Sequence, residues 1–195
     1  MPLFKPTSLS EKLQFSTVRL ETGNGSSGTG FYFEFSIVNK KIPIIITNKH
    51  VVNHNTKETV TFAVHVQDGE LINKMNVRYI ADWIFHEDKN IDLCFCFINP
   101  LFEELSKQSK IVFYQKITED LIWYNEKLES LSAIEDITMV GYPTGLWDKS
   151  NNLPLFRRGI TATHPAIDFN QKSIGVVDLA CFPGSSGSPI FILNE

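Results

Sequence analysis

Apolar and polar side chains alternate along several short stretches of the chain. The clearest alternation runs through residues 31–37 and residues 59–66. A period of two residues is typical of a β-strand that places one face on a core. Shorter apolar runs predict further strands at residues 42–47, 77–81, 91–98, 137–140, 155–163, 173–180 and 188–193. Many short strands separated by glycine turns favour a mostly β fold, and we expect two β-barrels in tandem.

The middle of the chain has a different pattern. Residues 100–107 predict a short helix, and residues 118–131 carry apolar side chains near helical spacing. Thr118, followed by acidic residues, is typical of a helix start. We therefore expect three parts, which are an N-terminal barrel half at residues 1–112, a helical connector at 113–134 and a C-terminal barrel half at 135–195.

Composition and charge argue against several classes of protein. The 195 residues include 18 Lys and Arg against 22 Asp and Glu, which gives a formal charge of −4. This mild acidity argues against a nucleic-acid partner, because phosphate recognition relies on a positive surface. No apolar run approaches the roughly 20 residues of a membrane-spanning helix, so we expect no membrane partner.

The cysteines are few. Cys94, Cys96 and Cys181 form an odd, sparse set, which is typical of buried thiols in a reducing compartment. The first residues also lack the apolar stretch of a secretory signal, and together these features favour a cytoplasmic location. Cys94 and Cys96 resemble half of a metal site, but no second Cys or His cluster has matching spacing. We therefore expect no metal and no organic cofactor.

A serine between glycines stands near the C-terminus, in the segment at residues 182–189. Glycine lets the backbone turn sharply, so Ser186 can be exposed while nearby N–H groups face solvent. An exposed hydroxyl beside free N–H groups is what acyl transfer requires. With Ser186 as nucleophile, the N–H groups of Gly184 and Ser186 are candidates for the oxyanion hole. The alternative is a flexible turn before an edge strand.

His50 is the best-placed base for such a serine, whose hydroxyl is a weak nucleophile on its own. It follows the predicted strand at residues 42–47, whereas His65 is expected on a sheet face and His86 and His164 in loops. His50 and His54 also have the spacing of metal ligands on a helix, but Val51 stands where zinc peptidases have glutamate. The alternative is that His50 has only a structural role, with its hydrogen bonds satisfied at the end of the strand.

Asp92 is the candidate that orients the base. It opens the apolar strand predicted at residues 91–98, where burying a carboxylate is costly unless the carboxylate is paired. An imidazole would supply that partner. Asp178, which also begins an apolar stretch, is the alternative carboxylate.

With these three residues in the order His, Asp, Ser, the sequence resembles a trypsin-like serine peptidase of the chymotrypsin fold, particularly the bacterial, disulfide-free branch. The matching segments are residues 28–31, 46–52, 91–93, 139–143 and 184–189. The resemblance implies two six-stranded antiparallel barrels with the site between them. It also implies a catalytic triad of His50, Asp92 and Ser186, with the oxyanion hole at the amides of Gly184 and Ser186.

The chain departs from the family pattern in three places. Ser185 stands where digestive members often have Asp, so activation by a freed N-terminus is not expected. Ala180 and Cys181 stand near the base of the family's substrate pocket, which favours a small or apolar residue before the scissile bond. The sequence ends at Glu195, so we expect a second barrel that is incomplete unless a C-terminal segment or a partner chain completes it.

These features predict a serine endopeptidase that hydrolyses a peptide or protein substrate through an acyl-enzyme intermediate. The alternative is a catalytically impaired, peptidase-like module that binds peptides or partner proteins. A hydrolase of small esters would use the same nucleophile.

Overall fold

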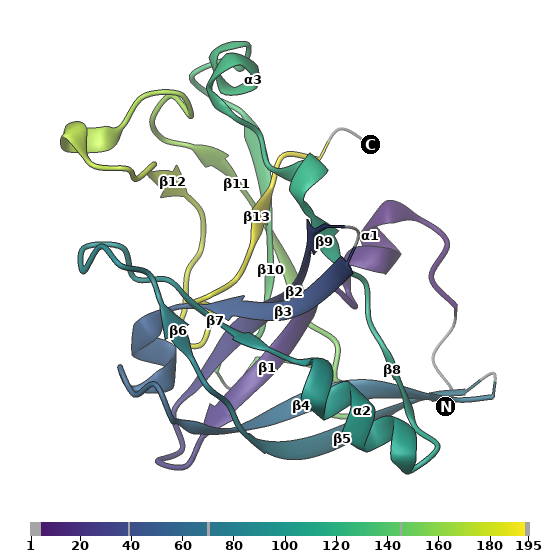
Figure 1. Cartoon of the computed structure of the whole chain (residues 1–195). Coiled ribbons are helices and arrows are strands. Elements are labelled where there is room, and N and C mark those ends of the chain that lie inside the picture. Colours follow the sequence, from purple (N-terminus) through teal and green to yellow (C-terminus); the bar gives the residue numbers. More distant parts are fainter. Residues whose placement is uncertain (1–4, 39, 70, 145, 194–195) are drawn as a thin grey trace.

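The computed structural model describes residues 5–38, 40–69, 71–144 and 146–193 (Figure 1). Within these ranges the mostly β, antiparallel fold predicted from the sequence is confirmed. The first sheet contains β1 (Thr17–Thr22), β2 (Ser27–Ile37), β3 (Lys40–Thr47), β4 (Thr59–Asp68), β5 (Leu71–Ile80), β6 (Ile84–Phe85), β7 (Cys94–Phe97), β8 (Ile111–Phe113) and β9 (Ile117–Thr118). The second sheet contains β10 (Asp136–Gly141), β11 (Leu155–Thr161), β12 (Val177–Asp178) and β13 (Ile190–Phe191).

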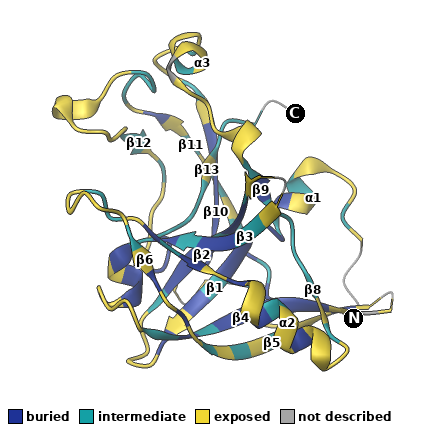
Figure 2. Ribbon diagram, viewed as in Figure 1, coloured by how far each residue is buried: buried dark blue, intermediate teal, exposed yellow. Residues whose placement is uncertain are grey.

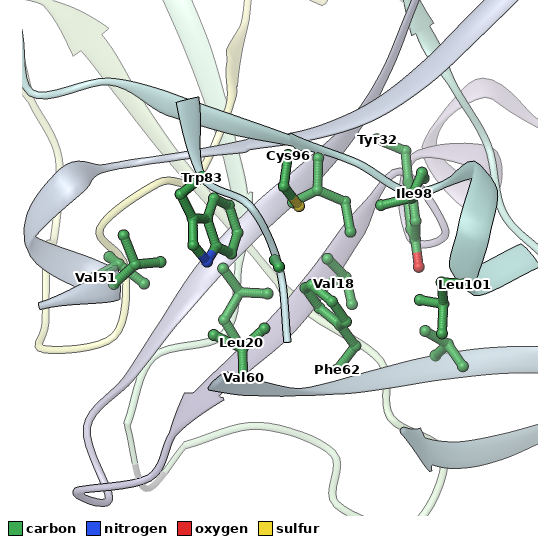
Figure 3. Packing of buried hydrophobic residues seen from close by; sticks show 14 of the residues in the cluster. Val18, Leu20, Tyr32, Val51, Val60, Phe62, Trp83, Cys96, Ile98 and Leu101 are labelled. Carbon is green, nitrogen blue, oxygen red and sulfur yellow. The ribbon is translucent and has the colours of Figure 1, made fainter. Parts of the chain in front are cut away.

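The first sheet encloses the main core. Its strands follow the order β5-β4-β1-β2-β3-β7-β6, and all of these neighbours pair antiparallel, while β9 adds to β2 in parallel. Alternation along the strands sends one set of side chains inward. The set includes Val18, Leu20, Phe62, Cys96 and Ile98, all of them almost fully buried (Figure 3). This packing gives the site a rigid base.

Short helical segments precede the strands or lie between them. They are α1 (Leu9–Leu13), α2 (Asn99–Lys107), α3 (Asn125–Glu129) and the 3₁₀ turns η1 (Lys49–Val52), η2 (Glu119–Leu121) and η3 (Phe169–Gln171). Helix α2 has Pro100 in its first turn, where no N–H partner is needed, and buries Leu101 and Leu105. Figure 2 shows that α3 is largely exposed, in contrast to the buried inner strands. No helix in the described ranges is long and apolar enough to span a membrane.

The helix predicted over residues 118–131 is wrong. The structure has β9 ending at Thr118, then η2, an extended residue at Tyr124 and the single turn of α3. The apolar side chains of this segment find no common core face, because Leu121, Trp123 and Tyr124 are all more than 40% exposed. Apolar side chains at helical spacing do not stabilise a long helix when no surface of the protein packs against them. The strand predicted at residues 173–180 is likewise reduced to β12.

Phe62 is the large core side chain whose truncation is expected to cost most. It is fully buried at the centre of β4, with its ring 5.9 Å from that of Tyr79. Phe62→Ala should lower the free energy of unfolding by about 3–5 kcal/mol, because it removes apolar contacts and leaves a cavity. Urea denaturation measures this, with Leu121→Ala as an exposed control expected to change stability by about 0.5 kcal/mol or less. Equal effects of the two variants would contradict this view of the core.

The two sheets are held together by polar contacts of residues 151 and 152. The Asn152 amide donates to the Ala63 carbonyl (2.8 Å), and the Tyr142 hydroxyl donates to the Asn152 carbonyl (3.0 Å). The ring N–H at Nε2 of His65 donates to the Asn151 carbonyl (2.9 Å). The bonds to Ala63 and His65 join β4 of the first sheet to the segment between β10 and β11, and the Tyr142 bond holds that segment together.

His65 makes the stability of the protein dependent on pH. Burial lowers the pKa of His65 below its ordinary value of 6.5. The unfolded chain therefore binds a proton at a higher pH than the folded chain does, so stability falls as pH decreases through this value. The slope is at most about 1.4 kcal/mol per pH unit, and it ends once the pH is below the folded pKa.

The test compares the wild type with His65→Gln, which keeps a donor but does not titrate. Urea denaturation between about pH 7.5 and about pH 5.5 should show a steeper loss for the wild type. Parallel curves for the two proteins would show that His65 is not the group responsible.

Candidate active site

His50 lies on the 3₁₀ turn η1, directly after β3. The following residues, Val51 and Val52, are buried in the main core and fix this turn. The His50 side chain points the other way and is 49% exposed. Its Nδ1 is hydrogen bonded to Oδ2 of Asp92, and its backbone N–H donates to Oδ1 of the same carboxylate (3.2 Å). Both carboxylate oxygens therefore face His50.

Asp92 lies just before β7 and not inside the apolar strand. The expectation of a strand from residue 91 is corrected, because β7 begins at Cys94 and Asp92 belongs to the preceding loop. The carboxylate side chain is 43% exposed, so it escapes the full cost of burial. The alternative carboxylate, Asp178, is exposed on β12, and no contact joins it to His50 in the described part of the chain.

Thr29 of β2 holds the serine loop, which we define as residues 182–188. Its N–H donates to the Ser186 carbonyl (2.9 Å), and its hydroxyl donates to the Gly184 carbonyl (3.0 Å). The Thr47 hydroxyl, at the end of β3, donates to the Thr29 carbonyl (2.7 Å). The loop is thus fixed to β2, and Thr47 bonds this part of β2 to β3, the strand that leads into His50.

The amides of Gly184 and Ser186 are left free by this arrangement. The Pro183 carbonyl accepts the Thr144 N–H (2.6 Å), and the Ser185 carbonyl accepts the Ser188 N–H (3.0 Å). In a trans peptide the N–H points opposite to the C=O. The N–H groups of Gly184 and Ser186 therefore point away from these contacts, and neither has a hydrogen-bond partner among the described residues.

Two glycines make this loop geometry accessible. Gly184 and Gly187 have φ angles of 87° and 82°, in the left-handed region that favours glycine. A Cβ at Gly187 would stand 2.0 Å from the Thr29 carbonyl oxygen. A side chain at Gly187 would therefore push the loop away from β2, and one at Gly184 would press on the backbone of Tyr142 and Thr144.

The structure brings the three candidate residues together to different degrees. His50 and Asp92 are in direct contact, and the backbone of Ser186 is bonded to β2 beside the end of β3. Ser186 is partly exposed, and in the described ranges its hydroxyl makes no hydrogen bond, to His50 or to another group. The Ser186 hydroxyl can therefore be reached from the solvent.

The residues expected at the substrate pocket, Ala180 and Cys181, are both exposed. The interpretation of all three cysteines as buried is corrected for Cys181, whereas Cys94 and Cys96 are buried. Burial, with the nearby Asp92 charge, raises the pKa of Cys94 to about 12, so this thiol is not a nucleophile.

Arg157 of β11 is a site residue that the sequence did not reveal. Its Nη1 donates to the Ser185 hydroxyl (2.9 Å) and the Ala180 carbonyl (3.2 Å), and its guanidinium lies 4.6 Å from the centre of the Phe182 ring. Arg157 thus supports the serine loop at Ser185. The only sequence signal for Arg157 is its place in the alternation of β11, on the same face as Leu155 and Gly159.

Comparison with known proteins identifies the family to which the chain belongs. The family model "Trypsin-like peptidase domain" matches residues 28–194. The match spans most of the chain, so the protein belongs to this family, and the resemblance seen in the sequence is confirmed. No curated protein sequence matches the chain. A crystal structure of Deg5 superposes with a TM-score of 0.56 at 15% identity, covering 93% of this chain and 76% of that chain. At that identity the likeness shows the fold alone.

Proposed function

We propose that the protein is a serine endopeptidase that uses His50, Asp92 and Ser186. One observation carries the proposal. The His50 ring is paired with the Asp92 carboxylate just after β3. The neighbouring strand β2 binds the serine loop, in which the N–H groups of Gly184 and Ser186 have no partner among the described residues. Membership of the trypsin-like peptidase family supports the reaction class.

The geometry suggests a role for each group. The Asp92 carboxylate accepts the proton of His50 Nδ1, which leaves the Nε2 lone pair free to take the proton of the Ser186 hydroxyl. The serine oxygen then attacks the peptide carbonyl and forms an acyl-enzyme, and His50 returns the proton to the leaving amine. The N–H groups of Gly184 and Ser186 stabilise the negative oxygen of the tetrahedral intermediate.

A fluorophosphonate probe tests this function directly. We expect a covalent adduct on Ser186, located by peptide mass spectrometry, that is absent in Ser186→Ala and formed more slowly in His50→Ala. Ser188→Ala is a matched control, because its buried hydroxyl has no partner among the described residues and belongs to the same segment. A folded wild-type chain that forms no adduct would refute the proposal.

A second candidate function is peptide binding without turnover. It is favoured by β13, which among the described residues pairs with β10 on one side only (Figure 1). This strand also borders an apolar groove of about 420 Å³. The groove is lined by residues of α1, α3 and residues 190–193, together with Leu121 and Trp123. A free strand edge beside apolar side chains suits an extended peptide or a segment of a partner chain. Peptide binding that survives Ser186→Ala, with no hydrolysis at any pH, would favour this function.

A further inference from the structure

Three consecutive residues, Asn48, Lys49 and His50, all reach the same loop. This loop, residues 86–93, connects β6 to β7 and carries Asp92 near its end. The Asn48 side-chain amide donates to the Asp92 backbone carbonyl (2.6 Å). His50 contacts the Asp92 carboxylate through its ring and its backbone N–H. Lys49, between them, turns inward.

Lys49 is a buried cation that binds only backbone carbonyls. The residue is 7% exposed, and its Nζ donates to the carbonyl oxygens of His86 (2.9 Å) and Asp88 (3.1 Å). No carboxylate forms a salt bridge with it in the described ranges, although the Phe85 ring lies 5.9 Å from the ammonium. A buried ammonium is costly unless its protons are bonded, so an apolar side chain would be the simpler way to fill this space. The two carbonyls explain why a lysine stands there.

The loop that Lys49 binds is closed at its base by the His86 N–H, which donates to the Leu93 carbonyl (2.9 Å), and its tip is held only by local bonds and by Lys49 in the described ranges. Residues 86–90 are exposed, and the internal bonds of the loop are local, such as the Asp88 N–H to the His86 ring and the Asn90 N–H to the Asp88 carboxylate. By contrast, Val51 and Val52 anchor η1 in the core. The lysine therefore links a fixed turn that carries His50 to an exposed loop that carries Asp92.

We propose that Lys49, assisted by Asn48, is a positioning residue. It holds the loop in the position at which the Asp92 carboxylate contacts the His50 ring. The inference rests on the proposed function of that pair. Lys49 touches no reacting atom, and it acts through the backbone carbonyls of residues 86 and 88. Loss of the lysine lets the loop drift, and a displacement of about 1 Å at a catalytic group is enough to lower a rate by about 100-fold.

The variant Lys49→Met keeps the length of the side chain and removes the charge and the donors. We expect the rate constant of fluorophosphonate labelling at saturating probe to fall about 100-fold, with the half-saturating probe concentration unchanged. Lys49→Arg, which keeps a cation and its donors, should recover most of the rate. The control variant Lys89→Met removes an exposed positive charge from the loop itself and should behave as wild type.

A proton NMR measurement provides a readout that does not depend on activity. The His50 Nδ1–H bonded to Asp92 is expected as a low-field resonance in the wild type, and this resonance should weaken by exchange in Lys49→Met while the remaining spectrum stays folded. Asn48→Ala, which removes a single bond to the loop, should give the same change to a smaller degree and serves if Lys49→Met does not fold.

The outcomes separate this inference from the proposed function. A wild type that shows the resonance but forms no adduct refutes the peptidase while the variants still test the role of Lys49. A Lys49→Met protein that is less stable but keeps the wild-type resonance and labelling rate overturns the inference, because the lysine is then only structural. Failure of Lys49→Arg to recover a lost resonance would likewise overturn it.

Discussion

Ser186→Ala and His50→Ala are each expected to lower the turnover of a peptide substrate by about 10⁶-fold. The serine oxygen forms the acyl-enzyme bond, and the ring at position 50 accepts its proton, so neither group works without the other. The double variant should therefore be no worse than either single variant. Steady-state hydrolysis of a fluorogenic peptide library measures all three proteins against the wild type.

The residual activity identifies the contribution of the serine loop. Free amides at Gly184 and Ser186 should keep a rate about 10³–10⁴-fold above that of water in every triad variant. Thermal unfolding should be little changed, because Ser186 is partly exposed and its hydroxyl makes no hydrogen bond in the described ranges. Additive losses in the double variant would mean that the two residues act independently, which the proposed mechanism does not allow.

The main strands of the fold are predictable from local pattern. The alternation at residues 31–37 and 59–66 lies within β2 and β4, and residues 100–107 lie within α2. Strand β1 was missed because only two apolar residues, Val18 and Leu20, carry its alternation, although both are fully buried. The helix over residues 118–131 failed for the opposite reason, since its apolar spacing is real but its side chains have no core face.

The candidate site is predictable only in part, because its remaining contacts are long-range. A histidine at a strand end and a serine between glycines can be recognised in the sequence. The contacts of Lys49 with the carbonyls of residues 86 and 88 span 37 and 39 residues, and backbone acceptors leave no residue signature. The same holds for Thr29, whose bonds to Gly184 and Ser186 depend on how the two sheets meet.

Asp92→Asn is expected to lower turnover by about 10⁴-fold while leaving the size of the side chain unchanged. A carboxylate only accepts hydrogen bonds, so it keeps the ring proton on Nδ1 of His50. Oδ1 already accepts the His50 backbone N–H (3.2 Å), so an amide oxygen would stay at that position and the amide N–H₂ would face the ring. Nδ1 would then accept, and the ring proton would move to Nε2. A ring with its proton on Nε2 cannot take one from Ser186.

The measurement is the hydrolysis rate of the best peptide substrate, with Asp88→Asn and Asp178→Asn as controls. Asp88 lies in the same exposed loop, and Asp178 is the other carboxylate that the sequence proposes, so both variants make the same change in charge. Each control should remain within about threefold of the wild type, because neither carboxylate meets the His50 ring in the described ranges. An Asp92→Asn protein that retains a tenth or more of the wild-type rate would mean that the ring does not need its carboxylate. In that case His50 would act as the base for Ser186 without being oriented by the Asp92 carboxylate.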